Sequence, residues 1–310
     1  MQNNSTMFYQ KNGLVVIMLS RDLVCLSPED RMTPIAEYEK RFGFSRWTIQ
    51  TAIRFLLDNE CMELEKRGPK GTFIAKLDYE KLWGYTGWNP LLGVLPVPTS
   101  KTHNALLTGL SKSLRKQHVP FNFSFQTPVS SRLESLNNQR CHFVMTSKLA
   151  MRVVQEKYPE LETAAELGGC LYSKPYRLYY HSDYFRGVED GMSVAVNDRS
   201  IEQSFMTDQV CLGKKVKKVY LPYHESISLF QRKKVDFLLQ RADADDYVGM
   251  QDRSYSLSHL GFDQEIMTPV IAVHRQNYGI EKLIKRNIDA VEIAEIQQKV
   301  LSGAMDPAYY

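Results

Sequence analysis

The sequence lacks the cysteine patterns that support disulfide frameworks or zinc fingers. Its five cysteines are odd in number, lie far apart along the chain and include no Cys-x-x-Cys pair. Scattered cysteines of this kind are typical of buried packing residues in a reducing compartment. The sequence therefore predicts neither a structural zinc site nor a disulfide scaffold, and we expect no metal and no cofactor.

Long hydrophobic runs are also missing. No apolar stretch approaches the ~20 residues that a membrane-spanning helix needs. The first residues, Met1–Thr6, have neither the basic start nor the apolar core of a signal peptide. These absences predict a cytoplasmic protein without a membrane partner.

No strong excess of one charge is present. The chain has 39 Lys and Arg against 35 Asp and Glu, a net charge of +4, which permits an anionic partner but is too small to indicate one. An apolar content of 43% over 310 residues is that of a folded protein with room for two domains.

Motifs of known catalytic sites are absent as well. The sequence contains no Gly-x-x-x-x-Gly-Lys-Ser/Thr phosphate loop, no His-Glu-x-x-His pair and no Gly-x-Ser-x-Gly elbow. His224, Glu225 and Ser226 are the residue types of a nucleophilic triad, but adjacent residues cannot all face one another. We therefore do not expect an enzyme.

The most informative segment that is present is Pro34–Lys76, which follows a predicted first helix within Gly13–Leu26. Thr33 and Pro34 are typical of a helix start, Gly43 suits a left-handed turn, and Ser45 is a second predicted N-cap. Two alternating segments, predicted to be strands, then flank a basic turn. Two short helices followed by a hairpin are the layout of a winged helix-turn-helix, which is an α+β module. The apolar stripe of its second helix consists of Ile49, Ala52, Ile53, Leu56 and Leu57, and the predicted strands are Met62–Glu65 and Thr72–Ala75.

The opposite face of that second helix carries long polar side chains that suit phosphates and base edges. The face is formed by Arg46, Trp47, Gln50, Thr51 and Arg54. The hairpin turn adds the cations Lys66, Arg67 and Lys70, where a wing would meet neighbouring phosphates. This pattern predicts binding to double-stranded DNA. The alternative is a winged helix that contacts another protein.

The same segment resembles the GntR-type winged-helix regulators. The similarity lies in Ile35-Ala36, in Phe42-Gly43-Phe44-Ser45-Arg46, in Thr48-Ile49, in Ala52-Ile53 and in Gly71-Thr72-Phe73-Ile74. The resemblance implies that Ser45, Arg46 and Thr48 approach DNA and that the glycine-rich tip enters the minor groove. Two features differ: Gln50 stands where the family often has Arg, and two residues instead of one separate Gly68 from Gly71. The predicted DNA-contacting residues are Ser45, Arg46, Thr48, Gln50, Arg54, Arg67 and Lys70.

Residues Leu82–Pro90 break both periodicities and are the predicted linker, which gives domains at 1–82 and 91–310. Beyond the linker, strand-like and helix-like segments alternate, a pattern that predicts parallel sheets in an α/β architecture. The predicted strands are Leu91–Val97, Phe121–Phe125, His142–Thr146, Tyr176–His181, Val194–Val196, Val216–Leu221 and Val235–Leu239. The predicted helices are Thr102–Lys116, Ser130–Leu136, Ile201–Phe205 and Glu225–Lys233.

The final stretch, Thr268–Val273 followed by Ile280–Leu301, is expected to return to the first of two alternating blocks. This wiring predicts a two-lobed α/β domain of the periplasmic-binding-protein-like (type II) kind, with a ligand cleft between lobes. Lobe 1 would comprise about 91–180 and 262–310, and lobe 2 about 183–258.

Ligands of open α/β sheets bind beyond the carboxyl ends of strands, next to helix N-termini. Four strand ends here are polar and suit a small anion, with Arg199 as the main charge partner. The alternative is that these side chains only cap helices. The predicted ligand-binding residues are Thr99, Ser100, Thr146, Ser147, Asp198, Arg199, Ser200, His224 and Glu225.

The whole chain resembles the YhfZ family of regulators, in which such a domain follows a helix-turn-helix. The matching motifs are Asn197-Asp198-Arg199-Ser200, Met206-Thr207-Asp208, Tyr223-His224-Glu225-Ser226 and Ser302-Gly303-x-x-x-Pro307-x-Tyr309. The resemblance does not supply an effector.

These observations together predict a DNA-binding transcriptional regulator that senses a small, anionic effector. A homodimer is expected, because one winged helix covers too short a stretch of DNA for operator specificity. The alternatives are a solute-binding or adaptor protein whose winged helix contacts proteins and, least favoured, an enzyme on the α/β domain.

Overall fold

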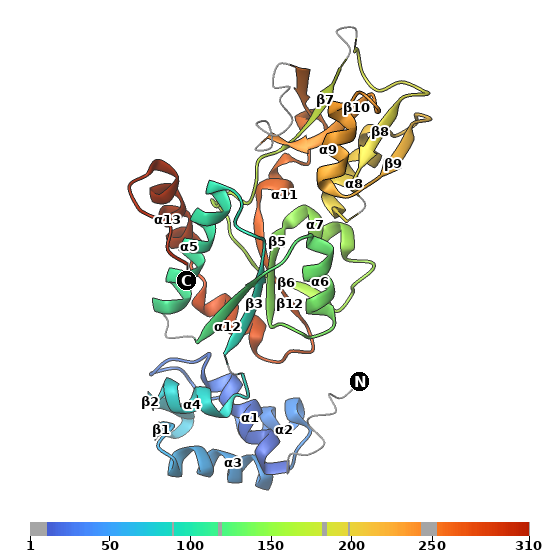
Figure 1. Cartoon of the computed structure of the whole chain (residues 1–310). Coiled ribbons are helices and arrows are strands. Elements are labelled where there is room, and N and C mark those ends of the chain that lie inside the picture. The colour runs from blue at the N-terminus through green and yellow to red at the C-terminus, as the bar shows by residue number, and fades with distance from the viewer. Residues whose placement is uncertain are drawn as a thin grey trace. The chain divides into compact units, whose positions relative to one another are not determined.

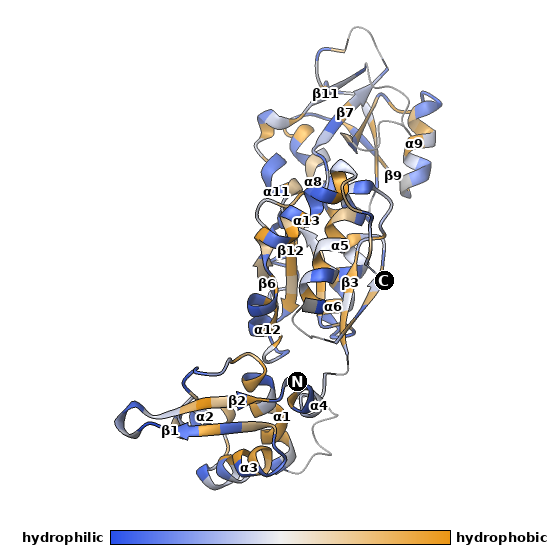
Figure 2. Ribbon diagram, turned by 90° about the vertical axis from the view of Figure 1, so that its left-hand side faces the viewer, coloured by the Kyte–Doolittle hydropathy of each residue, from blue (hydrophilic) through white to orange (hydrophobic). Residues whose placement is uncertain are grey.

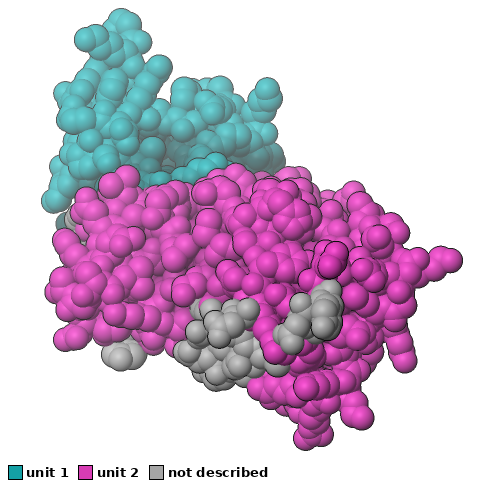
Figure 3. Space-filling view, turned by 90° about the horizontal axis from the view of Figure 1, so that it is seen from above, with its two compact units in different colours: residues 1–91, 276–286 teal, residues 92–275, 287–310 magenta. Residues whose placement is uncertain are grey.

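The chain forms two compact units (Figures 1 and 3). The computed structural model describes residues 11–88, 90–116, 120–181, 185–197, 199–242 and 253–309. Unit 1 comprises residues 1–91 and 276–286, and unit 2 comprises residues 92–275 and 287–310. This division differs from the predicted domains in one main respect. The segment 276–286, expected in lobe 1 of the C-terminal domain, belongs to the N-terminal unit.

Unit 1 is the predicted winged helix-turn-helix with an additional helix from the far end of the chain. Its elements are α1 (Lys11–Leu23), α2 (Ile35–Phe42), α3 (Arg46–Asp58), β1 (Met62–Lys66), β2 (Thr72–Leu77), α4 (Tyr79–Tyr85) and most of α12 (Ile280–Asn287). Gly43 ends α2 with a left-handed φ of 70°, and Ser45 caps α3 by accepting a hydrogen bond from the Thr48 amide at 3.4 Å. Both features confirm the predicted turn.

Two local predictions in this unit were inaccurate. Helix α2 begins at Ile35, one residue later than expected, and Pro34 occupies the cap position without a side-chain hydrogen bond. Ile49, Ala52 and Leu56 are buried as predicted, but Leu57 is 36% exposed. The stripe on α3 is therefore narrower than the sequence pattern suggests.

The predicted linker is a structured part of unit 1. Residues up to Tyr85 form α4, and Trp88 is buried with its ring centroid 5.7 Å from that of Trp83. The guanidinium of Arg21 lies over the Trp88 ring at 5.0 Å. The glycines and the proline predicted a loop over this whole stretch, but a loop is present only near residue 87. Aromatic packing keeps the rest of the stretch in the fold of unit 1.

Unit 2 contains two five-stranded sheets, each flanked by helices. The first has the strand order β4-β3-β5-β12-β6 and the second β11-β7-β10-β8-β9. The strands of the first sheet are β3 (Leu91–Leu95), β4 (Phe121–Phe125), β5 (Phe143–Ser147), β6 (Leu161–Glu166) and β12 (Pro269–His274). Those of the second are β7 (Tyr176–Tyr180), β8 (Ser193–Val196), β9 (Lys217–Tyr220), β10 (Phe237–Arg241) and β11 (Ser254–Ser256).

The sheets are mixed, whereas the sequence pattern predicted parallel ones. β12 returns to the first sheet as expected but runs antiparallel to both β5 and β6, and β7 runs antiparallel to β10. A strand buried on both faces reads as a continuous apolar run in either direction, as Val270–Val273 does in Figure 2. Such a run predicts burial, but it does not specify the direction of the neighbouring strand.

Helices cover both faces of the first sheet, with α5 and α13 on one side and α6 and α7 on the other (Figure 1). The helices of unit 2 are α5 (Lys101–Lys116), α6 (Val129–Asn137), α7 (Lys148–Val154), α8 (Ile201–Val210), α9 (Tyr223–Gln231), α11 (Asp263–Met267) and α13 (Ala290–Ser302). The stretch Ile280–Leu301, expected to return to the first block, contains the two helices α12 and α13. Asp289 begins α13 by accepting hydrogen bonds from the Val291 and Glu292 amides at 3.0 and 3.1 Å.

Helices α5 and α13 approach closely at Gly109, and this contact gives a first prediction. A Cβ atom at Gly109 would lie 2.9 Å from the backbone oxygen of Ile293. Overpacking of this kind costs ~1–3 kcal/mol, and a backbone neighbour cannot move aside easily. Gly109→Ala is therefore expected to lower stability despite the ~1 kcal/mol gain in helix propensity. Gly84→Ala, where no atom lies within 4 Å, is expected to have the opposite sign. Thermal unfolding followed by circular dichroism measures both, and a Gly109→Ala variant as stable as the parent would contradict the packing argument.

Candidate DNA-binding surface and ligand cavity

The exposed face of α3 carries four of the polar and aromatic side chains predicted to reach DNA. Arg46, Gln50 and Arg54 are exposed, and Trp47 is 69% exposed. Thr48 differs from the prediction: its side chain is buried, and its hydroxyl forms a 2.9 Å hydrogen bond with that of Ser45. The hydrogen bonds between Ser45 and Thr48 thus stabilise the start of α3. The accessible surface of the helix is formed by the exposed side chains named above.

The wing is the hairpin of β1 and β2, whose tip is a 3₁₀ turn over Gly68–Lys70 with a hydrophilic surface (Figure 2). The charge of Arg67 is partly compensated there. Its guanidinium pairs with Glu29 at 2.8 Å and Glu65 at 2.6 Å, and it lies 4.6 Å from the centroid of the Phe73 ring. Lys70 is exposed. Of these two predicted phosphate contacts, Lys70 is therefore the better placed to neutralise a phosphate.

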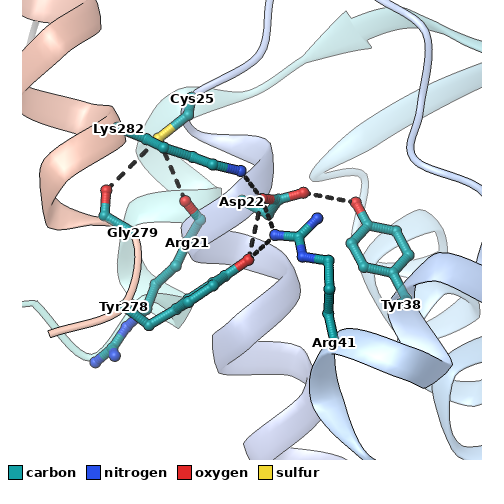
Figure 4. A network of polar contacts seen from close by, with 8 residues as sticks. All are labelled: Arg21, Asp22, Cys25, Tyr38, Arg41, Tyr278, Gly279 and Lys282. Atoms are coloured by element: carbon teal, nitrogen blue, oxygen red, sulfur yellow. Dashed lines mark hydrogen bonds and ion pairs between the residues drawn. The ribbon is translucent and has the colours of Figure 1, made fainter. Parts of the chain in front are cut away.

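A buried carboxylate joins the helix-turn-helix to the segment that returns from the C-terminal part of the chain (Figure 4). Asp22 on α1 is 3% exposed and accepts hydrogen bonds at 2.9 Å from Tyr38, from Arg41 and from Lys282. The hydroxyl of Tyr278 lies 3.2 Å from the same carboxylate and also contacts Arg41. Tyr38 and Arg41 belong to α2, whereas Tyr278 and Lys282 belong to the segment 276–286. Asp22 therefore connects three parts of unit 1.

This carboxylate stays ionised. Burial by itself would raise the pKa of Asp22, but hydrogen bonds and charges from Arg41 and Lys282 outweigh it, so its pKa lies below the ordinary value. Burial and the Asp22 charge raise the pKa of Tyr278 to about 12, which keeps its hydroxyl protonated as a donor. At neutral pH, therefore, Asp22 is ionised and the Tyr278 hydroxyl is protonated.

Unit 2 contains a cavity of about 420 Å³ at the carboxyl ends of several strands. This is where an α/β sheet presents loops and helix N-termini to a ligand. The volume lies within the range of small-molecule sites. The lining residues are Pro96, Val97, Thr99, Ser100, His103, Thr127, Pro128, Val129, Arg132, Tyr172, Tyr176, Asn197, Ser200, Glu202, Gln203, Gln240 and Arg241.

Two guanidinium groups line this cavity in different environments. Arg132, 3% exposed, donates to the backbone oxygens of Gln126 at 2.7 Å and Met145 at 3.2 Å and to the Tyr172 hydroxyl at 3.0 Å. All three acceptors are neutral. Arg241 pairs with the buried carboxylate of Glu202, which also accepts a hydrogen bond from the Ser147 hydroxyl. Arg132 consequently brings a positive charge that no carboxylate of the described residues compensates.

Two further lining side chains carry buried polar atoms without ordinary hydrogen bonds. Neither ring nitrogen of His103 has a hydrogen-bond partner of normal geometry, and the side-chain nitrogen of Gln240 lacks one among the described residues. Burial, with the charges of Arg241 and Arg132, lowers the pKa of His103 to about 3, so the ring is neutral. Buried polar atoms are normally paired. These atoms therefore mark positions that a ligand or water can satisfy.

The structure brings together only part of the predicted ligand site. Thr99, Ser100 and Ser200 line the cavity, and Ser147 lies behind it in contact with Glu202. The capping alternative also holds, because Ser100, Ser147 and Ser200 accept hydrogen bonds from the His103, Ala150 and Gln203 amides at 3.1, 3.0 and 3.3 Å. The two roles are compatible, since a capping hydroxyl keeps its own proton for a ligand.

The other predicted residues lie elsewhere. Thr146 is buried in the sheet, and Arg199, His224 and Glu225 are exposed and do not line the cavity. Asp198 lies outside the described residues. Arg199, the expected main charge partner, does not line the cavity, whereas the guanidinium groups of Arg132 and Arg241 do.

Signals for the missed residues are present in the sequence. Arg132 stands four residues before Leu136 on the buried side of α6, and a charge on an apolar stripe is unusual. His103 follows the cap Ser100 in the first turn of α5, and Arg241 is the last residue of strand β10, two positions after the apolar run Phe237–Leu239. The rule that sites lie at strand ends and helix starts finds Arg241 when it is applied to the end of β10. It finds His103 when it is applied to the first turn of α5.

Within the described ranges, no three His, Cys, Asp or Glu side chains are grouped so as to hold a metal ion. No helix among them is both long enough and apolar enough to cross a membrane.

Comparison with known proteins gives matches over nearly the whole chain. Residues 29–74 match a family described as a helix-turn-helix domain, and residues 78–309 match the family described as the YhfZ C-terminal domain. The uncharacterized protein YhfZ of Escherichia coli K12 is 24% identical over 97% of this chain and 99% of its own.

Solved structures agree with the fold. The crystal structure of YhfZ from Shigella flexneri has a TM-score of 0.65 and 23% identity, covering 74% of this chain and 97% of that one. The periplasmic aliphatic sulphonate binding protein SsuA of Escherichia coli has a TM-score of 0.53 and 14% identity, covering 69% and 74%. The α/β unit is thus periplasmic-binding-protein-like, and, with three quarters of its length matched by the family's own C-terminal domain, the chain belongs to the YhfZ family.

Proposed function

We propose that this chain is a cytoplasmic, DNA-binding transcriptional regulator whose unit 2 senses a small anionic molecule. Unit 1 binds duplex DNA through α3 and the wing, and the cavity of unit 2 takes the effector. The observation that carries the proposal is the presence, in one chain, of a winged helix-turn-helix with an exposed polar recognition face and a binding-protein-like fold with a polar cavity.

DNA binding is supported by the chemistry of the exposed side chains. Arg46 and Gln50 have the donors that read guanine and adenine edges in the major groove, and Arg54 and Lys70 suit phosphates. A helix-turn-helix is a common module for this purpose. The exposed Trp47 adds an apolar surface that suits a thymine methyl group.

Effector binding is supported by the cavity. Its buried guanidinium groups and hydroxyls suit an anion, and a structural neighbour, SsuA, is a binding protein for aliphatic sulphonates. An effector that binds one arrangement of the chain more tightly than another shifts the chain toward that arrangement and so changes its affinity for DNA. The size of this change is limited by the difference between the effector's binding free energies to the two arrangements.

We further propose a homodimer, since paired half-sites give the operator specificity that a single module lacks. Light scattering at micromolar concentration measures this directly. A mass near the 35.8 kDa of one chain, with and without DNA, would contradict the dimer.

The test of the proposed function is an electrophoretic mobility shift with the DNA upstream of the protein's own gene. We expect a sequence-specific complex that survives excess nonspecific competitor. Absence of any complex would instead favour a solute-binding or adaptor protein whose winged helix contacts another protein.

Three substitutions separate the roles of the basic residues. Arg46→Ala is expected to weaken binding by ~1–3 kcal/mol with loss of discrimination at one base pair, because a base contact specifies sequence. Lys70→Ala should weaken binding to all sequences alike and reduce the slope of log affinity against log salt by about 1. Arg67→Ala should reduce that slope less, because Glu29 and Glu65 already pair with Arg67. Titrations across salt measure all three, and equal effects of Arg46→Ala and Lys70→Ala would refute the assigned roles.

A further inference from the structure

We infer that the effector is a small organic monoanion, a carboxylate or sulfonate without an ammonium group, bound in the cavity of unit 2 next to Arg132 and His103. This inference rests on the proposed function and specifies the ligand class of its effector site. It follows from the charges, the acceptors and the donors of the described lining residues.

The charge of the cavity favours a ligand with one negative charge. Arg132 and Arg241 each contribute a positive charge, Glu202 contributes a negative one, and His103 is neutral. The described lining residues therefore carry a net charge of about +1 at neutral pH. A monoanion compensates this charge, whereas a dianion leaves one negative charge in a partly desolvated site.

The acceptors of the cavity do not suit an ammonium group. Glu202 is the one acidic side chain among the described lining residues, and it is 2% exposed. One of its oxygens accepts from Ser147 and the other pairs with Arg241. An α-amino acid would bring an ammonium group to a site whose carboxylate already has two partners, so its amine would lose hydration without gaining an ion pair.

Several hydrogen-bond donors that line the cavity lack a protein acceptor. Arg132 has five N–H groups and donates three of them to protein acceptors, which leaves two. The side-chain nitrogen of Gln240 is unpartnered, and neutral His103 offers one N–H and one acceptor. A ligand rich in acceptors, such as a carboxylate or sulfonate with a further carbonyl or hydroxyl oxygen, matches this set. Helices α5 and α8 begin next to the lining residues Ser100 and Ser200, and the positive end of a helix dipole favours an anion.

The test is isothermal titration of the full chain at constant ionic strength and neutral pH. The probes are 2-oxobutyrate and butane-1-sulfonate as monoanions, 2-aminobutyrate as a zwitterion and succinate as a dianion, with sodium chloride as a control. We expect either monoanion, or both, to bind at least ~10-fold more tightly than the zwitterion and the dianion, a difference of one charge interaction in such a site. Preference between the two monoanions then distinguishes a carboxylate from a sulfonate ligand.

A matched pair of variants ties this preference to the cavity. Thr99 lines the cavity and is exposed, so substitutions there leave the core intact. Thr99→Asp adds a negative charge, whereas Thr99→Asn has the same size and is neutral. Monoanion binding should be at least ~10-fold weaker in the Asp variant than in the Asn variant. Equal effects of the two variants would overturn the inference.

The outcomes separate this inference from the proposed function. Tighter binding of 2-aminobutyrate or succinate would overturn the monoanion assignment and leave an effector site in the cavity. Failure of all probes would also overturn it, and the mobility shift with upstream DNA tests the regulator independently.

Discussion

Asp22→Ala is expected to destabilise unit 1 by about 3 kcal/mol. Breaking a buried ion pair costs about 3–5 kcal/mol, because the remaining partner keeps an uncompensated charge. The lower end applies here, since Lys282 is 53% exposed and can return to water, whereas the Tyr38 hydroxyl is buried with Asp22 as its acceptor. Urea denaturation measures the effect by fluorescence. All three tryptophans, Trp47, Trp83 and Trp88, lie in unit 1, so the signal reports on this unit alone.

The control is Glu63→Ala, which removes an ion pair with Lys76 in which both side chains are exposed. Exposed pairs contribute little, so we expect no measurable change. An equally small effect of Asp22→Ala would show that the network in Figure 4 adds no stability.

The same network predicts a pH dependence with a defined sign. The pKa of Asp22 is lower in the folded protein than in the unfolded chain, so its contribution is fully present above the unfolded value of about 4 and is lost as the pH falls through the folded value. The stability difference between the parent chain and Asp22→Asn should therefore shrink below about pH 4. A difference that stays constant down to strongly acidic pH would argue against an ionised Asp22.

The second large effect is expected for a fragment of residues 1–91, which should not fold cooperatively. The fragment lacks Tyr278 and Lys282, two of the four donors to Asp22. It also lacks Ile280, Leu283 and Ile284, which are 0–1% exposed in the intact chain. Burial of each such side chain contributes ~1.5–3 kcal/mol, and a small domain has only ~5–15 kcal/mol in total. Circular dichroism and tryptophan fluorescence in urea measure the loss.

A rescue variant distinguishes this explanation from general fragility of a short chain. Residues 276–287 are attached to residue 91 through a flexible Gly/Ser linker, which supplies the missing helix within one small polypeptide. We expect cooperative unfolding and DNA binding to return. A fragment 1–91 that folds by itself would refute the role of the returning segment.

Local patterns predicted the helix-turn-helix and most elements of unit 2. Gly43, Ser45 and the apolar spacing on α3 are short-range signals whose meaning does not depend on the rest of the chain. The membership of 276–286 in unit 1 depends instead on contacts between residues far apart in sequence, such as Asp22 and Lys282. A salt bridge of this kind leaves no periodic trace in the sequence.

The residues that line the cavity were predicted only in part, for a related reason. The rule that sites lie beyond strand ends located the loops of Thr99, Ser100 and Ser200 correctly on the cavity. The rule did not distinguish the lining residues from other polar residues at the strand ends. Ser and Thr occur there as helix caps whether or not a ligand binds. Arg132 lies within helix α6 and not at a strand end, so the rule could not select it, and the strand-end residue Arg199 is exposed.

The interleaved chain has a consequence for synthesis. The polypeptide passes from unit 1 to unit 2 after residue 91, returns at residue 276 and leaves again after residue 286. Domains whose residues are contiguous fold in order as they emerge from the ribosome. Because unit 1 includes residues 276–286, its helix-turn-helix can complete its folding only after nearly the whole chain has been translated. We therefore expect that nascent or prematurely terminated chains do not bind DNA, so that every molecule able to bind DNA also carries unit 2.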